Sequence, residues 1–134
     1  MTNARIFNSL PESVPAARRF ARGVLRGQPS ELVDAAELMV SELATNCVQH
    51  ARTDFEITIR TGDQVRVEVR DTNHGRPEVQ SLPPEASSGR GLRIVQEISD
   101  AWGIAPSLSG KTVWFALNLQ PATSSDAPLL DTVR

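Results

Sequence analysis

Residues 37–51 read ELMVSELATNCVQHA, and this stretch decides the fold of a chain of 134 residues. Its apolar residues recur at the spacing of an α-helix and form a continuous stripe. Glu42 and Asn46 lie four residues apart, so these two polar side chains share one face of the predicted helix. The stretch therefore predicts an amphipathic helix over residues 31–50, with Ser30 as its N-cap and a polar face beside the apolar one.

The carboxylate of Glu42 and the carboxamide of Asn46 place oxygen donors on that polar face. Such donors suit a hard divalent cation such as Mg²⁺, which takes few protein ligands and keeps several waters. His50 and His74 are not at metal-site spacing, and we assign no metal to either. The alternative is a polar helix face in water, so the sequence leaves both interpretations open.

Outside this helix the apolar pattern changes its period. Residues 55–60 and 65–70 alternate apolar and polar side chains around Gly62-Asp63, which predicts an antiparallel hairpin with one buried face. Residues 72–88 are rich in Pro, Gly, Ser and Asn without periodicity, and predict a long loop. The other predicted elements are an edge strand at 4–8, a helix from Val14 that has Ser13 as N-cap and ends at Gly27-Gln28-Pro29, a helix from near Gly91 with Ile94, Val95 and Ile98 inward, and short strands at 102–105 and 112–119.

These elements predict an α+β fold, a two-layer sandwich in which helices cover one face of a mainly antiparallel sheet. A chain of this length can bury a core without disulfide or metal support. We expect one domain over residues 4–119 and a flexible tail over residues 120–134.

The composition excludes several classes of protein. Fourteen Lys and Arg residues against 16 Asp and Glu give a net charge of -2, which a general nucleic-acid binder would not have. Arg18, Arg22 and Arg26 follow one face of the first helix, and we expect that face to be solvated. The single cysteine, Cys47, excludes an intramolecular disulfide and a thiolate-rich zinc cluster.

The sequence shows no signal of a targeting or membrane-spanning segment. No apolar run approaches the roughly 20 residues that span a bilayer. The N-terminus, MTNARIFNSL, lacks the charged and apolar regions of a signal peptide. We therefore expect a cytoplasmic protein with no direct nucleic-acid or membrane partner.

Asp71 ends an alternating strand and opens into the long loop. A carboxylate in that position can accept a hydrogen bond from an exocyclic amino group in a pocket. Gly75, four residues later, lets the backbone approach a ligand closely. The alternative is an aspartate that begins a turn, which is common.

Residues 87–92 read SSGRGL, at the end of the long loop and the start of a helix. Glycines there free backbone N–H groups to bind phosphate, and the helix N-terminus adds partial positive charge. Arg90 can add a charge-assisted hydrogen bond. The alternative is a flexible loop end with a glycine cap.

A second glycine motif has only a partial match to a known phosphate-binding loop. Gly110-Lys111-Thr112 resembles the end of a Walker A loop, but the required upstream glycine position holds Ala105. The residues that follow are strand-like, so we do not assign a phosphate loop here. Lys111 is the only lysine of the chain.

The order of these motifs resembles the Bergerat-fold ATPases, the superfamily of gyrase, histidine kinases and mismatch-repair proteins. Within it, the sequence is most similar to the bacterial anti-sigma-factor serine/threonine kinases, especially the stand-alone ATP-binding regulators of actinobacteria. Residues 37–51 match the N-box of that family, and residues 13–20, SVPAARRF, also resemble it. The resemblance covers residues 4–119.

The resemblance implies a role for each matching residue. Asn46 matches the asparagine that binds Mg²⁺, and Glu42 matches the carboxylate proposed as general base on a substrate hydroxyl. Asp71 matches the aspartate that binds the adenine amino group. The other matches are Gly75 beside the base, Gly89, Arg90, Gly91 and Leu92 in the box that closes the ATP lid on the phosphates, and Thr112 near the adenine.

The function that the resemblance implies is an ATP- and Mg²⁺-dependent serine/threonine kinase. It would phosphorylate an anti-anti-sigma-type partner and bind a sigma factor, and the resemblance suggests a homodimer. One alternative is a nucleotide-binding regulator that acts by protein contact alone, because Asn73 replaces the first glycine of the usual D-x-G-x-G box and the lid is short. A third candidate, the catalytic domain of a histidine kinase, is less favoured because we expect no room for a histidine-bearing helical hairpin.

Overall fold

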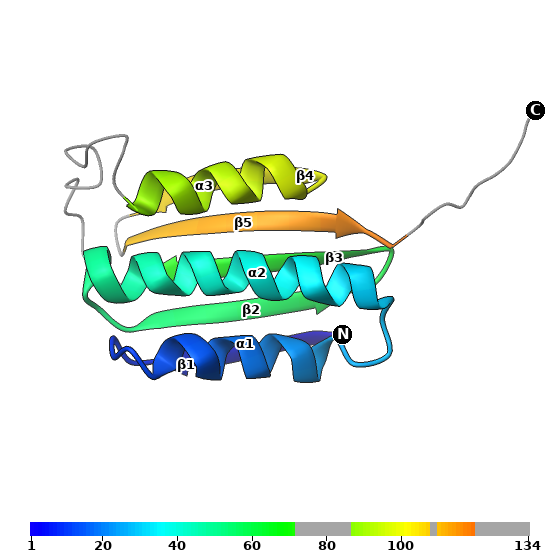
Figure 1. Cartoon of the computed structure of the whole chain (residues 1–134), viewed down its shortest axis with the longest axis horizontal. Coiled ribbons are helices and arrows are strands. Elements are labelled where there is room, and N and C mark those ends of the chain that lie inside the picture. Colours follow the sequence, from blue (N-terminus) through cyan, green and yellow to red (C-terminus); the bar gives the residue numbers. More distant parts are fainter. Residues whose placement is uncertain (72–86, 108–109, 120–134) are drawn as a thin grey trace, which may run out of the picture.

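The computed structural model describes residues 1–71, 87–107 and 110–119, with the backbone alone for residues 87–90 and 107. The described residues form two layers, in which three α-helices lie side by side on one face of a five-stranded sheet (Figure 1). The predicted α+β sandwich is therefore confirmed. The elements are β1 (Thr2–Phe7), α1 (Ser13–Val24), α2 (Ser30–Asn46), the π-helical turn η1 (Cys47–Ala51), β2 (Phe55–Thr61), β3 (Gln64–Asp71), α3 (Ser87–Ile98), β4 (Ala101–Ser107) and β5 (Gly110–Asn118).

The sheet has the strand order β1-β2-β3-β5-β4, and every neighbouring pair is antiparallel. The chain passes from β3 through α3 to the edge strand β4, and the β4–β5 pair then places β5 beside β3. The end of β3 and the start of β5 therefore lie next to each other, with Arg70 opposite Thr112.

The core lies between the sheet and the helices. Phe55, Ile57 and Ile59 alternate along β2 and are fully buried, as are Val65 and Val67 on β3. Burying one such side chain contributes about 1.5–3 kcal/mol, so this apolar seam holds α2 against the sheet. The buried residues of α2 are Leu32, Val33, Ala36, Met39, Val40, Leu43 and Ala44.

The opposite face of the sheet carries charged side chains. Arg66 Nε lies 3.0 Å from Glu68 Oε2, and an Arg70 guanidinium nitrogen lies 3.0 Å from Glu56 Oε1. The Arg66 guanidinium also lies over the Trp114 ring, 4.0 Å from its centroid. The β2–β3 hairpin thus has one buried and one charged face, as its alternation predicts.

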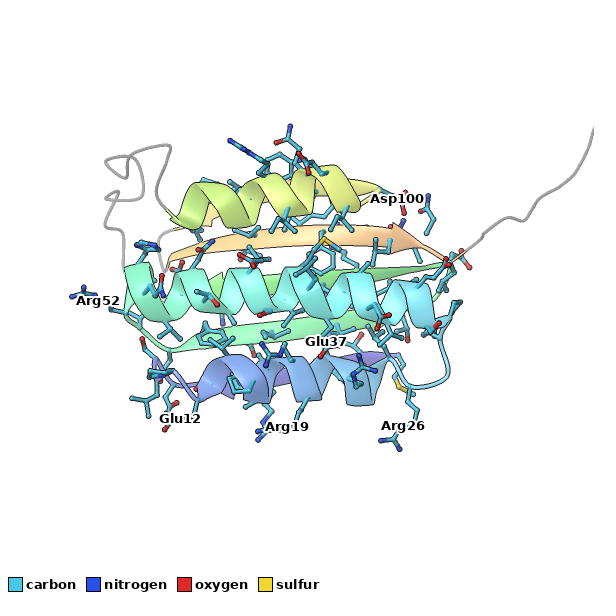
Figure 2. The ribbon with its side chains drawn as sticks, in the orientation of Figure 1. Glu12, Arg19, Arg26, Glu37, Arg52 and Asp100 are labelled. Atoms are coloured by element: carbon cyan, nitrogen blue, oxygen red, sulfur yellow. The ribbon has the colours of Figure 1, made fainter. Side chains whose placement is uncertain are left out.

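Arg22 and Arg26 on α1 are exposed, as predicted, but arginines of this face also bond to α2. Arg18 donates a hydrogen bond of 3.2 Å to Ser41 Oγ. Arg22 pairs with Asp34 at 3.3 Å and also with Glu37, which lies between α1 and α2 in Figure 2. Because α1 packs beside α2, these two arginines link the helices at the surface.

The predicted N-caps, Ser13 and Ser30, are both wrong by one residue. Glu12 already has helical angles (φ -69°, ψ -12°), so Ser13 lies inside α1, and its hydroxyl donates to Asn8 Oδ1 at 2.8 Å. The extended Pro29 (φ -54°, ψ 140°) precedes α2, so Ser30 is its first helical residue. Neither helix has a side-chain cap hydrogen bond.

The third helix begins earlier than predicted, at Ser87 instead of near Gly91. Glycine is a poor helix former, but that preference is weak beside the packing of α3 on α2. Val95 is buried as expected, whereas Ile98 is 37% exposed because it is the last residue of α3. Strand β4 extends through Pro106, which an edge strand tolerates.

Some predictions fall outside the described residues. These are the loop at 72–86, with Gly75 in it, and the tail at 120–134. Within the described residues, no helix is both long enough and apolar enough to cross a membrane.

Candidate functional site

Four chain segments end or begin at one end of the molecule. Figure 1 places there the C-terminal end of α2 with η1, the end of β3, the start of α3 and the start of β5. The antiparallel insertion of β5 beside β3 brings two of these ends together, and the packing of α3 on α2 brings the other two. The predicted motifs of α2, β3 and α3 therefore gather in one region.

Gly91 lies at the contact between α2 and α3. A Cβ at this position would lie 2.8 Å from Asn46 Nδ2 and 3.5 Å from Glu42 Cβ. A side chain at 91 would therefore displace Asn46. The structure thus brings Gly91 of the SSGRGL motif beside Glu42 and Asn46 of the 37–51 helix, and Leu92 next to Gly91 packs partly buried against the core.

The π-helical turn η1 begins directly after Asn46. The backbone N–H of Arg52 donates a hydrogen bond of 2.8 Å to the carbonyl oxygen of Cys47. The two residues are five apart, which is the spacing of a π-helix. The Val48 carbonyl is thereby freed from the α-helical pattern and accepts a hydrogen bond of 3.5 Å from Ser9 Oγ. Arg52 then ends the helix in the left-handed conformation (φ 58°). Turns of this kind are frequent at functional sites, and the apolar periodicity of α2 contained no sign of it.

Asp71 is one of only two polar side chains that are buried among the described residues, at 6% exposure. The backbone N–H of Lys111 on β5 donates a hydrogen bond to Asp71 Oδ1, with an N···O distance of 3.4 Å. The backbone of β5 therefore lies against the carboxylate. Gly110 has φ +136°, and a Cβ there would lie 2.2 Å from the Asp71 carbonyl oxygen. Only glycine fits both requirements.

Gly110 is therefore a site residue that sequence reasoning missed. The motif Gly110-Lys111-Thr112 was considered only as a phosphate loop, whereas its glycine is required for the close approach to Asp71. Thr112 on β5 lies opposite Arg70 on β3, and the next residues along the two strands are Lys111 and Asp71. Neighbouring residues of a strand point to opposite faces of the sheet. Lys111 therefore lies on the face of Asp71, and Thr112 lies on the other face.

The remaining predicted positions are described only in part. Gly89 and Arg90 lie in the first turns of α3, where the backbone alone is described, and Gly75 lies outside the described residues. The structure brings the α3 start to Glu42 and Asn46 through Gly91.

The thiol of Cys47 lies beneath the site. Its pKa is raised from 9.0 to about 12, mainly by burial and to a smaller extent by the Asp71 carboxylate, while the Lys111 ammonium acts in the opposite direction. The thiol is therefore protonated at neutral pH and acts as a packing group, not as a nucleophile.

The residues at this end fit a nucleotide with a metal ion. Glu42 and Asn46 offer oxygens, the start of α3 offers backbone N–H groups, and Asp71 offers a buried acceptor. Within the described residues, no three His, Cys, Asp or Glu side chains cluster in a way that could hold a metal by themselves. A cation at Asn46 would therefore need ligands from water or phosphate, which is the usual manner of Mg²⁺.

A cavity of about 370 Å³ lies at the opposite end, where α1 connects to α2. Arg22, Arg26 and Ser30 line it, and none of the predicted site residues does. In Figure 2 Arg26 lies at this end, and Arg52, which follows η1, lies at the other. The cavity is therefore separate from the candidate site.

Residues 7–117 match the family model of the histidine kinase-like ATPase domain. The chain belongs to this family. Blue-light-activated histidine kinase 2 of Erythrobacter litoralis is 34% identical over 82 residues, which are 56% of this chain and 23% of that protein. The chain thus spans less than a quarter of the relative's length. Membership of an ATPase-domain family implies that the chain binds ATP.

Solved structures show the same fold. The RsbU and RsbW domains of Rv1364c from Mycobacterium tuberculosis match 88% of this chain and 32% of that one, with a TM-score of 0.69 at 16% identity. The histidine kinase domain of the Erythrobacter litoralis EL346 blue-light-activated histidine kinase matches 81% of this chain and 60% of that one, with a TM-score of 0.51 at 25% identity.

We expect Gly110→Ala to lower the free energy of unfolding. The backbone conformation alone costs a non-glycine residue about 1–3 kcal/mol, and the contact with Asp71 adds to this. Gly23→Ala is the matched control, since a Cβ there meets nothing within 4 Å, and it should leave stability equal or up to about 1 kcal/mol higher. Urea unfolding followed by circular dichroism measures both, and equal stability of the two variants would contradict the account of Gly110.

We expect stability to fall as pH rises above about 9. The unfolded Cys47 thiol then loses its proton while the folded thiol keeps it up to about 12, which costs at most about 1.4 kcal/mol per pH unit. The chain has no Tyr and a single Lys, so few other groups titrate in this range. Urea unfolding at pH 8 and pH 10 should show a steeper loss in the wild type than in Cys47→Ala; the same loss in both would refute the assignment.

Proposed function

We propose that this chain is an ATP- and Mg²⁺-dependent serine/threonine protein kinase that acts on an anti-anti-sigma-type protein and binds a sigma factor. The observation that carries the proposal is the contact of Gly91 with Asn46 and Glu42. It brings Asn46, Glu42 and the start of α3 close to one another, which supports a shared role in binding Mg²⁺ and phosphate.

The nucleotide would lie across the end of the sheet. Asn46 would bind the Mg²⁺ ion, and the backbone at residues 89–91 would bind the phosphates with help from Arg90. Asp71 would accept a hydrogen bond from the adenine amino group, with Gly75 as a further candidate near the base. The bound Mg²⁺ supplies positive charge that offsets the charge of the phosphates.

Glu42 would act on the protein substrate. Its carboxylate accepts the proton of a serine or threonine hydroxyl while that oxygen bonds to the γ-phosphorus and the bond to the β-phosphate oxygen breaks. Phosphoryl transfer depends mainly on position and charge, so a single well-placed acceptor is enough. Glu42 is half-buried on α2 one turn before Asn46, so its carboxylate lies next to the proposed Mg²⁺ ligand.

Two observations support the proposed partners. Residues 37–51 resemble the N-box of the anti-sigma-factor kinases, and the fold resembles a structure that contains an RsbW domain. A separate protein is proposed as substrate, and a sigma factor as the second partner.

A second candidate is phosphoryl transfer to histidine. It is favoured by the 34% identity to a blue-light-activated histidine kinase. The two candidates differ in the bond they form, because phosphoserine and phosphothreonine survive acid whereas phosphohistidine is hydrolysed by it. Acid treatment of the labelled product therefore separates them.

We expect Glu42→Gln to lower phosphoryl transfer by about 10²- to 10⁴-fold, because the variant keeps the shape of the side chain and loses the proton acceptor. The measurement uses Mg²⁺ with γ-labelled ATP and candidate anti-anti-sigma-type proteins. Glu31→Gln is the matched control, since it makes the same change at an exposed position in the first turn of the same helix.

Acid-stable label on a partner, lost in Glu42→Gln and kept in Glu31→Gln, supports the proposal. Transfer by Glu42→Gln at the wild-type rate would remove Glu42 from the mechanism. ATP binding without label on any partner would instead support the regulator that acts by contact alone.

A further inference from the structure

We propose that Lys111 is a second base-contacting residue, whose ammonium donates a hydrogen bond to the ring nitrogen N1 of the adenine that Asp71 holds by its amino group. The inference rests on the proposed nucleotide site. It adds a hydrogen-bond donor for the base beside the Asp71 acceptor.

The strand geometry puts the two side chains on the same face. Lys111 alternates with Val113 and Phe115, which are buried against the helices. Asp71 alternates in the same way with Val69 on β3. Both side chains therefore leave their strands toward the helix layer, at the end where α2 stops.

The distance between the two residues is short. The Lys111 N–H lies 3.4 Å from Asp71 Oδ1, and the missing side chain at Gly110 allows this approach. Lys111 is itself only partly exposed. Its side chain therefore begins beside the Asp71 carboxylate.

Among the described residues, no ion pair involves Lys111. An ammonium on this side of the sheet can donate hydrogen bonds to a ligand there.

The chemistry of the base matches this pair. Adenine carries a donor, the exocyclic amino group, next to an acceptor, the ring nitrogen N1. A carboxylate is an acceptor and can bind only the first of these groups, whereas an ammonium is a donor and can bind the second. Asp71 and Lys111 together are complementary to that edge of the base.

Calorimetry with two ligands and three proteins tests the inference. We expect Lys111→Met, which keeps the chain length without the charge, to weaken Mg²⁺–ATP binding by about tenfold or more. The ligand 1-deaza-ATP lacks the N1 acceptor, so wild type and Lys111→Met should bind it equally. Arg93→Met, an exposed residue of α3, controls for the loss of one positive charge near the phosphates and should bind ATP as the wild type does.

The outcomes separate this inference from the proposed function. A wild type that binds no Mg²⁺–ATP overturns the proposed function itself. A wild type that binds ATP and 1-deaza-ATP equally overturns the role of Lys111 alone, without reliance on any variant. The same conclusion follows if Lys111→Met weakens both ligands equally, because the ammonium then acts on the phosphates.

Because Lys111 is the only lysine, amine-selective methylation gives a second readout in the native chain. The exposed N-terminal amine of Met1 serves as an internal reference in the same molecule. Mg²⁺–ATP should slow methylation of Lys111 several-fold relative to Met1, and tripolyphosphate should not. Equal protection by tripolyphosphate would contradict the base contact.

Discussion

The contact between α2 and α3 at Gly91 is the constraint on which the candidate site depends. Asn46 Nδ2 would be 2.8 Å from a Cβ at this position, so a side chain at residue 91 would displace the Asn46 carboxamide. The apolar seam between α2 and the sheet then fixes the pair relative to β3 and β5. Apolar packing thus holds the helices on the sheet. At Gly91, the absence of a side chain leaves room for Asn46 beside the start of α3.

A second glycine, Gly110, allows a close contact between two strands of the sheet. Gly110 allows the backbone of β5 to lie directly on Asp71, a buried carboxylate at the end of β3. The sheet order β3-β5-β4 makes this contact possible, because it brings together strands that are far apart in the sequence. Both glycines lie at the same end of the molecule, and the cavity between α1 and α2 lies at the other.

Much of the fold could be predicted from the sequence because its signals are local. Alternation on β2 and β3 and the apolar stripe of α2 correctly predicted which faces are buried. Helix boundaries were less predictable, since Ser13 and Ser30 look like N-caps but backbone angles at Glu12 and Pro29 place them inside their helices. The π-helical turn after Asn46 has no sequence signal, because it replaces one backbone hydrogen bond by another.

The site was predictable only in part, because its motifs gain meaning from tertiary contacts. Asp71, Asn46 and Gly91 could each be identified by type and position, and their order suggested a nucleotide. Gly110 and Lys111 could not be assigned, because the pairing of β5 with β3 is not visible in either strand alone. That pairing also places Thr112 on the face away from Asp71.

The most direct test of the account is an NMR titration of the ¹⁵N-labelled chain with Mg²⁺–ATP. The account predicts that the largest shifts occur at the amides of Asn46, Asp71, Gly91 and Gly110, at the end where α2, α3, β3 and β5 meet. Shifts confined to the amides of Arg26, Gly27 and Ser30, which line the cavity at the opposite end, would contradict it.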